Sequence, residues 1–215
     1  MGVKVISYDK ARPDMLPGDV IAFSGSGSFS ELIKFSTLSS VSHVAVIMQT
    51  KLMVDGDPQS GMFNQIIEAV TTQGVVIKRL SDKLKDYDGE IWWLPLRRSL
   101  QKSMDKKKFF DFLIHQEGKK YDMPQAVKSA LDASDNIPLI GKLTHNQEDF
   151  SAFFCSELVA GALETAGAIK HLNASEVTPI DLCRFAIFND DYYQIKGKLK
   201  SIKGYNTTDP VGWGE

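Results

Sequence analysis

The sequence predicts an α+β fold in which an antiparallel sheet packs against helices. Two observations lead to this prediction. Up to about residue 96, short apolar segments rich in β-branched residues alternate with turn sequences. From about residue 103 onward, apolar residues recur instead at helical spacing. Strands that come first and helices that follow are typical of an antiparallel sheet with helices gathered on one side.

A single domain is expected from the length and the composition. The chain has 215 residues, of which 43% are hydrophobic and 24% are charged. Such a chain can bury one sizeable core, and no linker, repeat or low-complexity tract divides it. We therefore expect one domain over residues 1–215, with a core at about 16–200 and a C-terminal tail at 204–215.

The first half of the chain is expected to form the strands. Leu16-Pro17-Gly18-Asp19 is a turn signal before the first strand, and Thr72-Gln73-Gly74 is expected to join two others as a hairpin. A glycine-serine loop at 25–30 lacks the third glycine of a dinucleotide-binding motif, so we interpret it as a mobile loop beside a cleft. The expected strands are residues 20–23, 42–48, 65–70, 75–80 and 90–96.

Helices are expected mainly in the second half. Gly118 ends one helical pattern, Pro124 suits the first turn of the next, and Gly167 suits the C-terminal cap of the last. The last pattern has an apolar stripe that includes Cys155. The expected helices are residues 31–36, 103–116, 124–131 and 152–166.

Charge and hydropathy make several classes of protein poor candidates. The formal net charge is −2, which gives no broad basic field for a phosphate backbone, so we expect no nucleic-acid partner. No apolar run approaches the roughly 20 residues of a membrane-spanning helix, so we expect no transmembrane segment. The first residues lack the apolar stretch of a secretory signal, and a cytoplasmic location is therefore the expectation.

A metal site is not indicated by the ligand residues. The two cysteines form no C-x-x-C pair, and the four histidines show no H-x-x-x-H spacing. Two cysteines also do not make a disulfide scaffold. We therefore expect no metal and no cofactor.

Cys155 is the candidate nucleophile. We expect it in the first turn of the helix at 152–166, where unsatisfied N–H groups and the positive end of the helix dipole lower the pKa of a thiol. The thiolate is the reactive form of cysteine. A single cysteine on an apolar stripe is also typical of a core residue, which stays an alternative. Cys183 has no comparable setting and is expected in the core.

His43 is the candidate general base. It stands at the head of the apolar strand at 42–48, where a titratable ring must find a partner or lie in a cleft. The other three histidines, His115, His145 and His171, lie in polar segments or loops. A hydrogen-bonded histidine with a purely structural role at the start of a strand is the alternative.

Glu68 is the candidate residue that orients the histidine. It lies inside the apolar strand at 65–70, where an unpaired carboxylate is costly. If this strand pairs with the one that carries His43, Glu68 can reach the ring and stabilise its protonated form. Asp55 is an alternative for this role, and Glu68 as a surface acid on an edge strand is another.

Four motifs carry a family resemblance when they are taken in order: residues 17–23, 42–46, 67–69 and 154–159. Together they resemble the permuted branch of the NlpC-type superfamily, and within it the bacterial YiiX/YebB-like group. The resemblance covers about residues 16–185. In ordinary enzymes of this superfamily the cysteine helix precedes the histidine strand, whereas here the histidine comes first, as in the permuted branch.

The resemblance implies a circularly permuted papain-like (NlpC-type) fold and a catalytic set of Cys155, His43 and Glu68. The segment at 118–122 is similar to a glycine–tyrosine–aspartate segment of these proteins. This similarity makes Tyr121 a candidate substrate-binding or oxyanion donor, alongside the backbone N–H of Cys155. A packed aromatic is the other reading of Tyr121. The chain departs from the lecithin:retinol acyltransferase-like enzymes of the same branch, because it lacks their Asn-Cys-Glu-His sequence and their second histidine.

The expected function is that of a cysteine peptidase or amidase that cleaves short peptides of cell-wall type through acyl transfer. The partner is then a small peptide substrate, with Lys119, Tyr121 and the loop at 25–30 as candidate walls of the cleft. Two alternatives stay open. One is a lipid acyl hydrolase or acyltransferase that uses the same cysteine and histidine on a lipid-like substrate. The other is a non-catalytic binding module.

Overall fold

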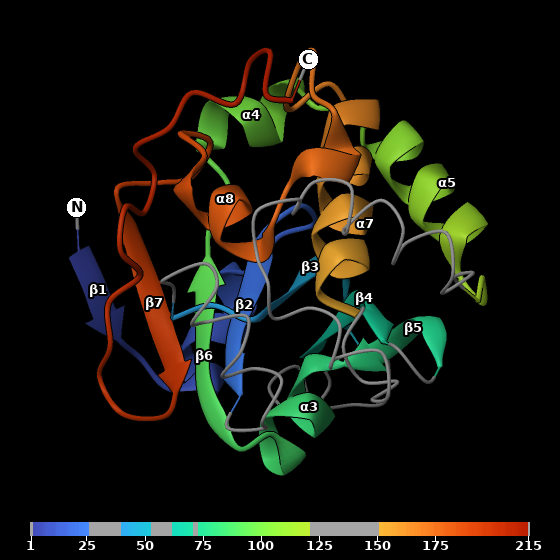
Figure 1. Ribbon diagram of the computed structural model, residues 1–215. Helices are drawn as coiled ribbons and strands as arrows, with labels where there is room; N and C mark the ends of the chain where they lie inside the picture. The colour runs from blue at the N-terminus through green and yellow to red at the C-terminus, as the bar shows by residue number, and fades with distance from the viewer. Residues whose placement is uncertain (1, 26–39, 53–61, 71–72, 121–150, 215) are drawn as a thin grey trace, which may run out of the picture.

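A computed structural model describes residues 2–25, 40–52, 62–70, 73–120 and 151–214. In this part of the chain, one sheet runs in the order β1-β7-β6-β2-β3-β4-β5 (Figure 1). The strands are β1 (Gly2–Val5), β2 (Val20–Gly25), β3 (His43–Leu52), β4 (Met62–Val70), β5 (Gly74–Arg79), β6 (Gly89–Leu94) and β7 (Asp191–Lys196). The helices are α1 (Tyr8–Ala11), α3 (Leu80–Asp86), α4 (Arg98–Ser103), α5 (Lys106–Gln116), α7 (Ser151–Thr165) and α8 (Pro179–Arg184), with 3₁₀ turns η1 (Arg12–Asp14) and η3 (Ala174–Glu176).

The sheet is mixed, which corrects the expectation of a wholly antiparallel one. β2 pairs antiparallel with β3 and β6, and the pairs β3–β4, β4–β5 and β6–β7 are antiparallel too. β1, however, runs parallel to β7. These two strands lie near opposite ends of the chain, so no short hairpin forces them to be antiparallel. The α+β class itself is observed.

All five predicted strands are present, and the observed bounds are shifted or longer by a few residues. The helices predicted at 103–116 and 152–166 correspond to α5 and α7. Those predicted at 31–36 and 124–131 lie outside the described residues. β1, β7 and the short helices, α4 among them, were not predicted, because no apolar pattern marks these short segments in the sequence.

Side chains of the sheet alternate between two apolar clusters. On β2, Val20 and Ala22 belong to the larger cluster, and Ile21 and Phe23 belong to the smaller one. α7 and α8 contribute to the larger cluster and lie in front of the strands in Figure 1. α1 and the start of α3 contribute to the smaller cluster. Both faces of the central strands are therefore buried.

α7 packs as a largely apolar helix. Its predicted stripe, from Cys155 through Leu158, Val159 and Ala162, is buried. The helix ends at Thr165, and Gly167 has a φ of 74°, a left-handed conformation that suits the expected glycine cap. None of the helices in the described parts of the chain is both long enough and apolar enough to cross a membrane.

The turn before β2 is held by the buried carboxylate of Asp19. Its Oδ2 accepts hydrogen bonds from the Leu16 backbone N–H and the Trp93 indole N–H, each at 2.9 Å. Its Oδ1 accepts from the Leu96 backbone N–H at 2.9 Å and from Gln101 Nε2 at 3.1 Å. Burial raises the pKa of Asp19 to about 6 although these donors act in the opposite direction. One side chain thus ties the turn to β6 and to α4.

We expect Asp19→Ala to lower the free energy of unfolding by about 3 kcal/mol, because it leaves several buried donors without an acceptor. Urea denaturation followed by circular dichroism measures the change. Asp14→Ala is the matched control, since Asp14 is exposed nearby and its loss should cost less than about 0.5 kcal/mol. Similar midpoints for the two variants would contradict this account of the turn.

Candidate active site

His43 is the first residue of β3 and lies beside Phe23 of β2. The two residues are register partners, and their ring centroids are 5.4 Å apart. The His43 side chain is 16% exposed, so it is buried on most sides and open on one. Phe23 belongs to the smaller apolar cluster and Cys155 to the larger one. The His43 ring contacts Phe23 and the Cys155 thiol. At the start of β3 it therefore links the apolar clusters on the two faces of the sheet.

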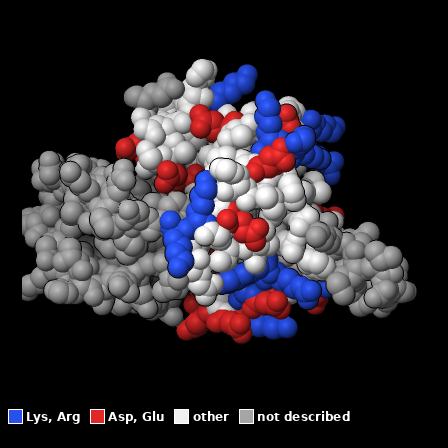
Figure 2. All heavy atoms as spheres, turned by 90° about the vertical axis from the view of Figure 1, so that its right-hand side faces the viewer, with Lys and Arg blue, Asp and Glu red and all other residues white. Residues whose placement is uncertain are grey.

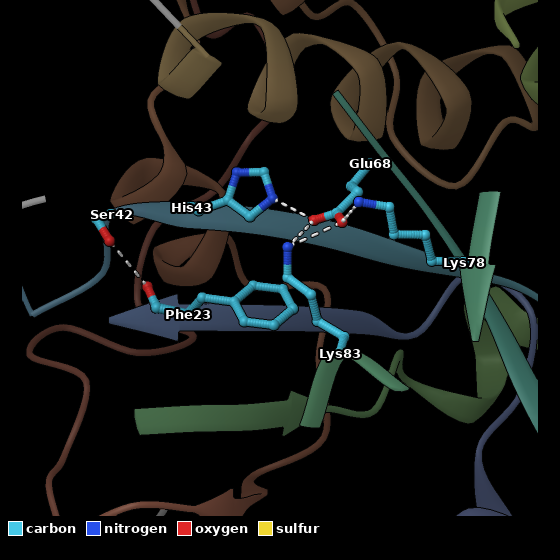
Figure 3. A network of polar contacts seen from close by, with 6 residues as sticks. All are labelled: Phe23, Ser42, His43, Glu68, Lys78 and Lys83. Atoms are coloured by element: carbon cyan, nitrogen blue, oxygen red, sulfur yellow. Dashed lines mark hydrogen bonds and ion pairs between the residues drawn. The ribbon is translucent and has the colours of Figure 1, made fainter. Parts of the chain in front are cut away.

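The register between β3 and β4 brings Glu68 to His43. Val46 pairs with Ile67, and side chains alternate along each strand, so His43 and Glu68 project from the same face of neighbouring strands. Glu68 Oε2 lies 2.8 Å from His43 Nε2 (Figure 3). The pairing of these two strands, which the sequence analysis gave as the condition for Glu68 to reach the ring, is present.

The Glu68 carboxylate is fully buried and surrounded by cations. Lys83 Nζ of α3 donates to both carboxylate oxygens at 2.9 Å, and Lys78 Nζ of β5 lies 3.8 Å from Oε1. Burial alone would raise the pKa of Glu68, but the His43 ring and Lys83 lower it to about 2. Glu68 is therefore ionised at neutral pH despite having no exposed surface.

Cys155 completes a chain of three groups. It is fully buried on α7, and its thiol hydrogen-bonds the His43 ring. Since Nε2 faces Glu68, Nδ1 is the ring nitrogen left for the sulfur. Burial acts to lower the pKa of His43, but Cys155 and Glu68 together raise it to about 9. A charged imidazolium held between the Cys155 thiol and the Glu68 carboxylate is therefore the state of His43 that this arrangement favours at neutral pH.

The position of Cys155 within α7 corrects one expectation. The helix begins at Ser151, so Cys155 is its fifth residue and lies beyond the first turn. At this position the backbone N–H bonds the carbonyl four residues earlier, and the effect of the helix dipole has largely decayed. The N–H of Cys155 therefore bonds within the helix and is not available as an oxyanion donor, and the contact that distinguishes the thiol is the one with the His43 ring.

The remaining sequence candidates divide into two groups. Cys183 lies buried in α8, and burial raises the pKa of its thiol, as expected for a core residue. Lys119 is exposed, and its backbone carbonyl accepts a hydrogen bond from the N–H of Val75. Tyr121, Asp55 and residues 26–30 of the glycine-serine loop lie outside the described residues.

Lys83 and Tyr87 are site residues that the sequence analysis missed. Lys83 Nζ lies 5.4 Å from the ring centroid of Phe23 and 5.8 Å from that of Tyr87. Tyr87, the C-terminal cap of α3, hydrogen-bonds Ser42 through its side chain. The sequence held a weak signal for Lys83. A buried carboxylate on β4 needs cations from neighbouring elements, and the segment that forms α3 follows directly after β5 and contains lysines.

Other candidate sites lie away from this centre. Among the described residues, no group of three or more histidine, cysteine, aspartate or glutamate side chains could hold a metal ion. A pocket of about 630 Å³ opens beside Asp19, Trp93 and Tyr193. It is not lined by Cys155 or His43, and the Asp19 carboxylate in its wall is already engaged by the turn.

Comparisons with known proteins give matches among solved structures alone. No family model and no curated protein matches the chain. Among solved structures, the chain is similar to the metalloprotein YiiX of Escherichia coli O157:H7, with a TM-score of 0.45 and 17% sequence identity. The similarity covers 74% of this chain and 70% of that one. The name is the one carried by the group that the sequence motifs resemble.

Alkylation should separate the two cysteines. Both are fully buried, so a difference in rate reports ionisation of the thiol more than static exposure. We expect iodoacetamide to label Cys155 at pH 7 at least about tenfold faster than Cys183, because only Cys155 has an imidazole partner. Mass spectrometry of the labelled peptides measures both rates in one sample.

His43→Ala is the companion variant for this experiment. It should move the labelling of Cys155 to higher pH and leave that of Cys183 unchanged. Equal labelling of the two cysteines, or a Cys155 rate that does not respond to His43→Ala, would contradict the interpretation of the site.

Proposed function

We propose that the chain is a cysteine hydrolase with a permuted papain-like fold, in which Cys155 attacks an amide carbonyl, His43 transfers the proton and Glu68 orients His43. The observation that carries this proposal is the position of the His43 ring, which contacts the Cys155 thiol and lies 2.8 Å from Glu68 through Nε2. Nucleophile, base and orienting acceptor in one hydrogen-bonded chain are typical of thiol acyl transfer.

The chemistry follows from the charges of the site. The Cys155 thiolate adds to the carbonyl carbon, and the electron pair of the C=O bond moves to oxygen. When the tetrahedral adduct collapses, the C–N bond breaks and the His43 imidazolium gives its proton to the leaving amine. The neutral ring then accepts a proton from water, which attacks the thioester, releases the acid and restores the thiolate–imidazolium pair. Throughout, the Glu68 carboxylate offsets the charge of the ring.

Access to the thiol is part of this proposal. Cys155 has no exposed surface, whereas the His43 side chain is 16% exposed. A substrate therefore approaches from the open side of His43, and the surface over Cys155 must open before the sulfur can attack. Loop and side-chain motions of this kind accompany substrate binding in many enzymes.

Short peptides are the proposed substrate class. On one side of His43 the described groups are charged, namely Glu68, Lys78 and Lys83, whereas the Phe23 ring lies on another. A lipid enzyme gains roughly 0.8 kcal/mol per buried methylene and needs a continuous apolar channel for it. Figure 2 shows basic and acidic side chains interspersed on the face that carries α5 and β5, a pattern that does not favour a polyanionic partner.

Glu68→Gln tests the orienting role. The amide can still hydrogen-bond the His43 ring but cannot offset its charge, so we expect turnover to fall by about 10²- to 10⁴-fold. The pKa of His43 should fall from its raised value, which an NMR titration of the ring measures. Asp55→Asn is the control for the alternative assignment and should change turnover little. A larger loss of turnover in Asp55→Asn than in Glu68→Gln would assign the orienting role to Asp55.

The substrate class is tested by comparing turnover of two panels of substrates, one of peptides and one of lipids. We expect Cys155-dependent hydrolysis of short peptides that bear lysine or diaminopimelate, and none of phospholipids or acyl esters. Liquid chromatography with mass detection follows both panels, with Cys155→Ala as the blank and a chelator in parallel. Turnover of lipids alone would overturn the peptide assignment and leave the proposed chemistry standing. The absence of Cys155-dependent turnover in either panel would favour a binding module.

A further inference from the structure

Lys83 makes more contact with Glu68 than His43 does. Its Nζ donates to both carboxylate oxygens at 2.9 Å, whereas the His43 ring engages Oε2 alone (Figure 3). Two contacts from one ammonium group keep both carboxylate oxygens turned toward Lys83. The orientation of Oε2 toward the histidine is therefore set from α3, an element that does not itself carry any of the three proposed catalytic groups.

The ammonium group of Lys83 is itself held in place. Its Nζ lies 5.4 Å from the centroid of the Phe23 ring and 5.8 Å from that of Tyr87. The side chain is only 20% exposed, so these interactions are partly shielded from water. A lysine fixed by two aromatic rings and a carboxylate has lost most of its rotamer freedom. Such a contact differs from that of a mobile surface ion pair.

The charges that face Glu68 come from every element packed around it. His43 approaches from β3, Lys83 from α3 and Lys78 from β5, and Cys155 of α7 acts on the other side of the His43 ring. Glu68 therefore interacts with two close cations, the His43 ring and the Lys83 ammonium group. Because Lys83 shares the carboxylate, the negative charge that Glu68 presents to the imidazolium is partly offset.

We propose that Lys83 is a positioning residue of the Cys155–His43 pair, which holds Glu68 in the orientation that His43 needs and limits how strongly Glu68 stabilises the charged ring. This inference rests on the proposed function for its catalytic consequence. The imidazolium must give its Nδ1 proton to the leaving amine, and a buried carboxylate at Nε2 without a second cation would stabilise the charged ring more and make it a weaker acid. Lys83 keeps Glu68 oriented toward the ring and leaves the Nδ1 proton transferable.

Removal of the charge tests the proposal. In Lys83→Met we expect the pKa of His43 to rise by about one unit, because a like charge near the imidazolium is lost. The upper limb of the pH profile for alkylation of Cys155 should move to higher pH by the same amount. Turnover at neutral pH should fall about tenfold, since the ring holds its proton more tightly and Glu68 is less well fixed. NMR titration of the ring and iodoacetamide labelling supply the two pH readouts.

Two further variants separate this role from a merely structural one. Lys83→Arg keeps the charge and the donors, so it should restore the alkylation profile of the unmodified chain. Lys78→Met is the matched control, because Lys78 Nζ lies farther from the carboxylate, at 3.8 Å, and its side chain is 35% exposed. In Lys78→Met the pKa of His43 should shift much less than in Lys83→Met. If Lys83→Met unfolds the chain, Lys83→Gln replaces it as a milder removal of the charge.

The outcomes also distinguish this inference from the proposed function. An unchanged His43 titration in Lys83→Met, or an equal shift in Lys78→Met, would overturn the role of Lys83 even when Cys155-dependent turnover is observed. Turnover that persists in Cys155→Ala would overturn the proposed function. The titration of His43 would still decide whether Lys83 controls the ring, because that measurement does not depend on a substrate.

Discussion

The ionised carboxylate of Glu68 is the constraint on which the candidate site depends. A carboxylate without exposed surface is costly unless charges and hydrogen bonds compensate it, and here His43 and Lys83 both do so. The compensation is mutual, because the same carboxylate keeps the His43 ring oriented and raises its pKa. The charged His43 ring in turn hydrogen-bonds the thiol of Cys155. The electrostatic surroundings of the cysteine thus depend on a carboxylate two contacts away.

The sheet supplies the precision for this arrangement. His43 and Glu68 are neighbours through backbone register, so their separation depends on the pairing of β3 with β4 and not on a loop. Cys155 comes from a helix much later in the chain, and α7 contacts both strands. Only the geometry of the three groups matters for their chemistry, so a histidine that precedes its cysteine in the sequence can form the same constellation.

The sequence was sufficient for the strands and for the pairing of His43 with Glu68, because a polar residue inside an apolar strand must find a partner. It was insufficient where the decisive contact comes from a short element. Lys83 lies on a seven-residue helix whose position follows from packing against β4, and no periodicity marks it. α7 begins within one residue of the expected start, but this makes Cys155 its fifth residue, where the helix dipole contributes less than the sequence analysis assumed. The parallel pair β1–β7 joins distant parts of the chain, which local patterns do not encode.

The raised pKa of His43 sets an upper limit on the pH range in which its ring is charged. With a value of about 9, the ring stays protonated through neutral pH. The lowered pKa of Glu68, about 2, means that the carboxylate stays ionised at neutral pH. Between these two values His43 and Glu68 are both charged, so their ion pair persists across the neutral range. The electrostatic part of the site is therefore set by two strand residues and by Lys83, which also contacts the Glu68 carboxylate.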